Sequence, residues 1–271
     1  MGTSQSSEGP GPGVALVPPW ADDVDETSDE AERDEVAPEE AAETKPVPVA
    51  PAGRFRDSRT ALGRFARSGN SQDLRRALRH YVQSGYGGSG TMTRRLGGTA
   101  ATAGRLSTVL QSAGTVDGTD LRDRILANGS DANAVLDAIV DATSPADGTQ
   151  DREAGRIAVR NALSALLERY PNADLLALED AQRVFVIERY AALDVFGRLC
   201  LDLQKTVMNK SPDATIGLRR LRYIREFITE QVSAAFRRLE ANGDRANSAR
   251  VAQITRDALR ETLTVFEEYT E

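Results

Sequence analysis

The chain is poor in the residues that build metal sites, disulfides and sheets. In 271 residues it has one cysteine, Cys200, and one histidine, His80. A lone cysteine excludes an intramolecular disulfide and is typical of a reducing compartment. The same scarcity excludes a zinc site made of histidine and cysteine ligands within one chain. Aromatic residues make up 5% of the sequence, which argues against an all-β sandwich because strands favour aromatic side chains.

Long apolar runs are also missing. No stretch approaches the roughly 18–20 apolar residues that cross a bilayer, so we expect a soluble protein with no membrane partner. The first fifteen residues contain neither the basic start nor the apolar stretch of a secretory signal peptide. Together these absences predict a cytoplasmic protein.

The charges that are present lie in two blocks of opposite sign. Residues 1–46 contain thirteen acidic and two basic side chains, whereas residues 54–105 contain eleven arginines and two aspartates. The formal net charge of −7 therefore hides an acidic segment followed by a basic one.

Residues 1–53 are predicted to form a disordered arm. The arm opens with small polar residues, crosses an apolar island at 14–20, runs acidic from 22 to 43 and closes on a proline-rich spacer. We interpret the acidic run as a solvated linker. The island ends in Trp20, the only tryptophan, and a disordered segment gains nothing by exposing it. We therefore interpret the island as a docking segment whose contact residues are Leu16, Pro18, Pro19 and Trp20.

From residue 54 onward the pattern predicts an all-α protein, with a basic, glycine-rich helical segment over 54–113 and a helical bundle over 114–271. Several short helices are expected at 58–69 (capped by Ser58), 71–85 (capped by Ser71), 91–113, from 117 or 119 to 128, 130–144 and 151–170. Three long helices follow at 174–209, 213–242 and 247–269. Ile157 is expected on the apolar face of the helix 151–170, and Leu218 on that of the helix 213–242. The 174–209 helix is apolar on nearly every face, which predicts a buried central helix. Short connections between long helices favour antiparallel packing.

No catalytic residue, cofactor or metal ligand is predicted. Residues 85–90 match the GxGxxG pattern of dinucleotide sites, but the preceding residues look helical rather than extended. A tightly turning connection is the better interpretation, and the helix start beside Arg94 and Arg95 could receive an anion or a partner. His80 has no neighbouring nucleophile to activate, and Cys200 is interpreted as a small buried hydrophobe.

Three features resemble the QatB family, a component of the bacterial Qat antiphage defence systems. They are the start MGTS with the island LVPPW at 16–20, the block over 69–98 that ends in GYGGSGTMTRRLGG, and the helical C-terminal half. The specific part of the resemblance covers residues 1–20 and about 64–112. It implies a non-enzymatic subunit whose partners are an ATPase, a QueC-like enzyme of deazaguanine chemistry and a TatD-like nuclease. Related systems suggest that a QueC-like enzyme joins a deazaguanine base to an N-terminal glycine. By resemblance, Gly2 would be the acceptor and Thr3 and Ser4 its recognition context.

The basic block 54–105 keeps a second class open, a helical nucleic-acid-binding protein. Its charge suits phosphate contacts, but it has few aromatic residues and no known DNA-reading pattern. The acidic arm would also compete for the same surface. Binding of the block to an acidic protein surface, or to the chain's own arm, is an equal alternative.

The two classes separate in a salt titration against labelled duplex DNA. Phosphate contacts would make the logarithm of the affinity fall linearly with the logarithm of the salt concentration. We expect no binding with that dependence, because a defence-complex subunit that docks a partner enzyme needs no phosphate contacts. A steep linear slope for the full chain would instead favour the nucleic-acid-binding class.

Overall fold

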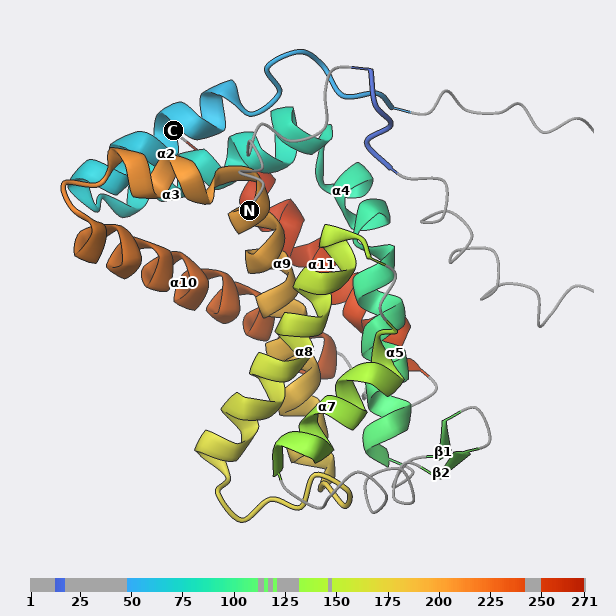
Figure 1. Cartoon of the computed structure of the whole chain (residues 1–271). Coiled ribbons are helices and arrows are strands. Elements are labelled where there is room, and N and C mark those ends of the chain that lie inside the picture. The colour runs from blue at the N-terminus through green and yellow to red at the C-terminus, as the bar shows by residue number, and fades with distance from the viewer. Residues whose placement is uncertain are drawn as a thin grey trace, which may run out of the picture.

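The computed structural model describes residues 13–17, 48–111, 115–116, 119–120, 132–145, 148–241 and 250–270 (Figure 1). The α-helices of these residues are α2 (Arg56–Ser68), α3 (Ser71–His80), α4 (Ser89–Arg95), α5 (Gly97–Gln111), α7 (Ala132–Thr143), α8 (Gln150–Arg169), α9 (Asp180–Lys210), α10 (Ala214–Ala241) and α11 (Val251–Glu267). A π-helical turn, η2 (Tyr81–Gly85), continues α3, and β1 (Thr115–Val116) pairs antiparallel with β2 (Thr119–Asp120). The prediction of an all-α helical bundle is confirmed.

Helix α9 is the central element of the bundle. Helices α8 and α10 pack along it, and α2 and α5 contact it as well. Its buried side chains point to every side, as those of Val186, Ile187 and Ala192 show. A helix surrounded in this way must be apolar around its circumference, so the predicted role of this segment is confirmed. One continuous hydrophobic core runs from Phe55 to Phe266 and joins the segment 54–113 to the segment 114–271.

Part of the N-terminal arm packs against this body. Residues 13–17 run beside 48–50, as the dark-blue segment in Figure 1 shows, with Ala15 and Val49 as bridge partners. The side chains of Leu16 and Val17 are 3% and 1% exposed. The arm is therefore not wholly separate from the fold, whereas residues 1–12 and 18–47 lie outside the described residues.

Two predicted helix caps differ in the structure, one because of a tertiary contact and one because a neighbouring residue caps the helix. Ser58 lies inside α2, where its buried hydroxyl donates to the carbonyl oxygen of Ala77 at 2.9 Å. The cap of α3 is Asn70 rather than Ser71, because the Asn70 side chain accepts from the amide of Gln72 at 2.9 Å. Both serines are acceptable caps by residue type, so local sequence alone could not select the observed residue.

Other predicted boundaries also change. The long helix begins at Asp180 instead of residue 174, because Glu179 and Gln182 form a capping box while Asp174 turns the chain by accepting from the amide of Leu176. The predicted helix 91–113 is two helices, α4 and α5, separated at Leu96.

A helix predicted to start at residue 117 or 119 is wrong at its beginning, since Thr119 and Asp120 form β2. Ile157 and Leu218 were placed on apolar faces but are 60% and 61% exposed. Within the described helices, none is both long and apolar enough to cross a membrane.

An aromatic cluster closes the end of the bundle near η2. The rings of Phe55, Tyr81 and Tyr86 lie 5.2–5.7 Å apart between centroids, and the guanidinium of Arg54 stacks 4.3 Å above the Phe55 ring. A Cβ placed on Gly85 would lie 2.6 Å from Cε1 of Phe55. Phe55 is 1% exposed and held on several sides, so it cannot move aside cheaply.

We therefore expect Gly85→Ala to lower the free energy of unfolding by about 1–3 kcal/mol through overpacking. Gly90→Ala is the matched control, because nothing lies within 4 Å of the Cβ it would add. The control should leave stability unchanged or raise it by up to about 1 kcal/mol, the gain of alanine over glycine in a helix. Urea unfolding of the three proteins measures the difference, and equal stability of Gly85→Ala and the parent chain would contradict the packing argument.

Candidate functional site

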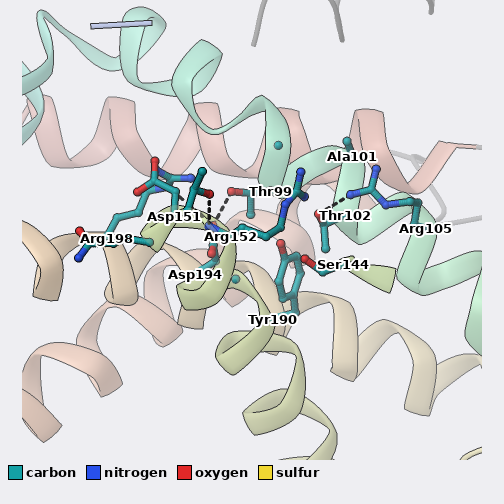
Figure 2. A pocket seen from close by; sticks show the side chains of 14 residues that line it. Thr99, Ala101, Thr102, Arg105, Ser144, Asp151, Arg152, Tyr190, Asp194 and Arg198 are labelled. Carbon is teal, nitrogen blue, oxygen red and sulfur yellow. Dashed lines mark hydrogen bonds and ion pairs between the residues drawn. The ribbon is translucent and has the colours of Figure 1, made fainter. Parts of the chain in front are cut away.

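A cavity of about 700 Å³ opens between α5, α8 and α9. Figure 2 shows its labelled side chains, which are mostly polar or charged. Helix α5 supplies residues from Gly98 to Arg105, α9 supplies Tyr190, Asp194 and Arg198, and the start of α8 with the loop before it completes the wall. This cavity, with its polar and charged lining, is the candidate functional site.

Small residues on α5 create the space. At Gly104 an added Cβ would lie 3.2 Å from the Cβ of Ala252 on α11, so one face of α5 packs closely against that helix. Gly98 and Ala101 line the cavity instead, and their small side chains leave it unfilled. The small residues of this helix therefore permit a close helix contact at Gly104 and also form a cavity wall.

A network of buried charges forms the inner wall. Arg198 is 7% exposed and its Nη1 donates to Oδ2 of Asp151 at 2.9 Å. The same Asp151 oxygen accepts from Nη2 of Arg95 at 3.1 Å. Asp194 lies one helical turn before Arg198, with 3.9 Å between its Oδ2 and Arg198 Nε, and accepts from the Thr99 hydroxyl at 2.5 Å. One arginine on α9 thus connects to carboxylates on α8 and α9, and through them to α4 and α5.

Burial decides the ionisation of this network. It raises the pKa of Asp194, and the neighbouring Arg198 and the Thr99 hydrogen bond only partly oppose that effect. For Arg198, burial acts to lower the pKa, but the charges of Asp194 and Asp151 outweigh it and the net direction is upward. Arg198 therefore stays charged while Asp194 is the group that takes up a proton most readily.

A second carboxylate, Asp202, lies two turns further along α9. Its Oδ2 accepts from the hydroxyls of Tyr81 at 2.9 Å and Tyr86 at 2.6 Å. Burial and the charge of Asp202 raise the pKa of Tyr86 to about 12, and burial first of all raises that of Tyr81. Both phenols are therefore donors at neutral pH, and this cluster fixes η2 against the central helix.

Two further arginines reach the cavity from facing helices. Arg105 on α5 donates from Nε to the carbonyl of Thr143 and from Nη2 to the Thr102 hydroxyl, both at 2.8 Å. Burial, and then the nearby charge of Arg152 on α8, lower the pKa of Arg105. Tyr190 lies at the base, where burial and then Asp194 raise the pKa of its phenol. The cavity therefore combines positive charge with neutral hydrogen-bonding groups.

Of the site residues predicted from the sequence, Arg95 belongs to the network of buried charges, and Leu16 is joined to it through Arg95. Arg95 donates from Nη1 to the Leu16 carbonyl at 3.4 Å, while Arg94 is exposed. The buried side chain of Leu16 is engaged within its own chain, so a partner could reach it only after displacement. Gly2, Thr3, Ser4, Pro18, Pro19 and Trp20 lie outside the described residues, and their roles stay predictions.

The glycine-rich connection before α4 does not form a nucleotide loop. Gly88 has φ +102, and the amide of Ser89 donates to Oε2 of Glu267 at 3.0 Å. A carboxylate of the chain itself therefore occupies this helix start, where an anion would otherwise sit. The preference for a tightly turning connection is confirmed.

The arginines of the basic block have separate structural roles. Arg64 and Arg76 both reach Asp73, at 3.0 and 3.5 Å, and Arg75 lies 5.7 Å from the centroid of the Tyr269 ring. Arg54 is buried over Phe55. Nucleic-acid binding by the block stays a prediction.

Neither the single histidine nor the single cysteine belongs to the cavity lining. His80 is half-buried at the end of α3. Cys200 packs partly buried against the core, and burial raises the pKa of its thiol to about 12. Among the described residues, no three histidine, cysteine, aspartate or glutamate side chains gather as a metal site would require.

The sequence analysis missed the charges of α9, although a signal was present. Asp194, Arg198 and Asp202 recur at intervals of four in the stretch 190–203 of α9, which is otherwise apolar. Such spacing places all three on one face, and buried charges need partners. Their partners, which lie in η2 and just after it, on α5 and on α8, are far away in sequence and have no pattern of their own.

Comparison with known proteins gives one family. A sequence model described as "Qat anti-phage system associated protein QatB" matches residues 87–266. This range is more than half of the chain and contains every residue that lines the cavity. It extends well beyond residue 112, where the specific resemblance read from the sequence ended. No curated protein and no solved structure matches the chain.

The buried Asp194 predicts a pH dependence of stability. Burial raises the pKa of the Asp194 carboxyl group above its ordinary value of 3.8. The protonated side chain therefore contributes its full share of the folding stability below pH 3.8, and this contribution is lost as the pH rises through the folded-state pKa. The Asp194→Asn side chain cannot ionise but still accepts a hydrogen bond from the Thr99 hydroxyl. Arg198 still has its ion pair with Asp151. We expect the stability of Asp194→Asn relative to the parent chain to increase from about pH 4 toward neutrality. Urea unfolding across that range measures it, and a difference independent of pH would contradict the assignment.

Proposed function

Because the chain belongs to the QatB family of Qat anti-phage system associated proteins, we propose that it is a non-enzymatic subunit that presents its N-terminal arm to a partner enzyme. It acts in the cytoplasm together with a QueC-like enzyme, an ATPase and a TatD-like nuclease. The QueC-like enzyme docks on the arm and modifies the amine of Gly2, which removal of Met1 exposes, with Thr3 and Ser4 as its recognition context.

The observation that carries this proposal is the attachment of residues 13–17 to the body. The amide of Gly13 donates to the Ala50 carbonyl at 2.9 Å, and that of Leu16 donates to Pro48 at 2.8 Å. The amide of Ala50 returns a hydrogen bond to Val14 at 2.8 Å. With Leu16 and Val17 buried, this stretch, called here the arm anchor, fixes where the first residues leave the protein.

The arm anchor also sets how far Gly2 can reach. Eleven residue steps separate Gly2 from Gly13, so the amine can extend at most about 36–40 Å from the anchor. The acidic run 22–43 lies between the two paired stretches and adds nothing to this distance. The enzyme must therefore dock close to the body, and we assign Leu16 the role of an intramolecular anchor that any direct contact with the enzyme would have to displace.

The chemistry suits an amine without a side chain beside it. A glycine amine can approach an activated carbon of a deazaguanine base closely, form the new carbon–nitrogen bond and release a proton as the activating group departs. This chain contributes only the acceptor, while activation of the base belongs to the partner.

Intact-mass spectrometry tests the acceptor. We expect a mass increase of nucleobase size on Gly2 only when an active QueC-like partner is co-expressed, and loss of both adduct and phage protection in Gly2→Glu. Gly9→Glu is the matched control in the same arm and should keep both. An unmodified Gly2 in a fully protective strain would end the modification hypothesis and leave docking alone.

The anchor is tested by a second pair of variants. Leu16→Asp places a charge where the side chain is 3% exposed, whereas Val14→Asp changes a side chain that is 48% exposed. We expect the adduct yield to fall in the first variant and to match the parent chain in the second. Equal yields would show that the anchor does not position Gly2.

A further inference from the structure

We propose that the cavity between α5, α8 and α9 binds a phosphate-bearing small molecule of nucleotide size. Its volume of about 700 Å³ lies within the range of ligand pockets, roughly 300–1,000 Å³. The inference is independent of the Gly2 proposal, since it concerns a site on the folded body and needs no partner.

The first argument is the pair of arginines at the rim. Arg105 and Arg152 come from facing helices and line the same space, close enough for the charge of one to act on the other. Like charges in one partly buried space repel each other, and a bound anion would reverse that repulsion. The two hydrogen bonds of Arg105 to Thr143 and Thr102 fix the plane of its guanidinium. These two bonds use two of the five N–H groups of the guanidinium, so the other three can donate to an oxyanion.

The second argument is the start of α8. Thr149 caps this twenty-residue helix by accepting from the amide of Arg152 at 3.2 Å, and it lines the cavity together with Gln150 and Asp151 of the first turn. A helix N-terminus carries partial positive charge and amide donors that favour phosphate. Asp151 does not cancel this field, because its carboxylate is shared by Arg95 and Arg198.

The third argument is a buried donor without an acceptor. Arg198 lines the cavity with a side chain only 8% exposed, yet its Nε has no hydrogen-bond partner. The nearest carboxylate oxygen, on Asp194, is 3.9 Å away. Buried donors are normally paired, and Nε is itself covered, so a ligand oxygen would complete the set once the Arg198 side chain turns toward the cavity that it lines.

Phosphate fits these features better than a planar carboxylate. Donors approach the cavity from three separate elements, α5, α8 and α9 (Figure 2). A tetrahedral oxyanion offers acceptor oxygens in several directions, whereas a carboxylate offers two in one plane. The remaining volume, beside Gly98 and Tyr190, would hold the organic part.

Isothermal titration of the full chain tests the proposal, with inorganic pyrophosphate, ATP and citrate as probes. We expect pyrophosphate or ATP to bind, and Arg105→Gln and Arg152→Gln each to weaken binding about tenfold or more, the effect of losing a charge-assisted hydrogen bond. Arg160→Gln is the matched control, since Arg160 lies on α8 in an exposed pair with Asp137, and it should change the affinity less than about twofold. Tighter binding of ATP than of pyrophosphate would show that the organic part is also bound.

Ala101→Leu provides a second route, because it fills the cavity wall without removing a charge. It should abolish probe binding while circular dichroism shows an unchanged helical fold, even if an arginine variant fails to fold. The proposal is overturned if neither pyrophosphate nor ATP binds at millimolar concentration, if citrate binds as tightly as pyrophosphate, or if Arg160→Gln weakens binding as much as the cavity variants.

Discussion

The pairing of Arg198 with Asp151, and its approach to Asp194, is the interaction on which the rest of this structure depends. It places a positive charge inside the central helix and gives it partners on α8 and α9. Removing one member of a buried ion pair typically costs about 3–5 kcal/mol, because the other charge is left without compensation. The positions of α4, α5 and α8 around α9 therefore depend on this network as much as on apolar packing. Through Arg95 it also reaches the backbone of Leu16 and the arm anchor.

The same network explains how a cavity survives in a packed bundle. Apolar walls would be expected to collapse or to be filled by larger side chains. Here polar groups line the space, and their partners hold them at fixed positions, such as Arg105 on the Thr143 carbonyl. Small residues on α5 prevent filling from the other side. Proteins depart from dense packing mainly at functional sites, and this cavity is such a departure.

The helices could be predicted from the sequence because their signals are local. Apolar spacing of three and four located α8, α10 and α11, and the apolar circumference of α9 identified its central place. The site could not be predicted in the same way. Arg95 was singled out for its position beside a helix start, but its partner Asp151 lies 56 residues away. The pairing of residues 13–17 with 48–50 closes over the whole acidic run, and no local pattern marks such a contact.

The π-helical turn η2 has a consequence for chain length. Tyr81 and Tyr86 are five residues apart, yet both hydroxyls reach the same oxygen of Asp202. In a regular α-helix, side chains five residues apart point about 140° away from each other. A π-helical turn holds one more residue than an α-helical turn, and this extra residue brings the two side chains onto one side of the helix. Shortening the chain by one residue between them would leave the tyrosines four apart, on one face of an ordinary α-helix. A relative one residue shorter at this turn would therefore still carry both tyrosines on the helix face that meets Asp202.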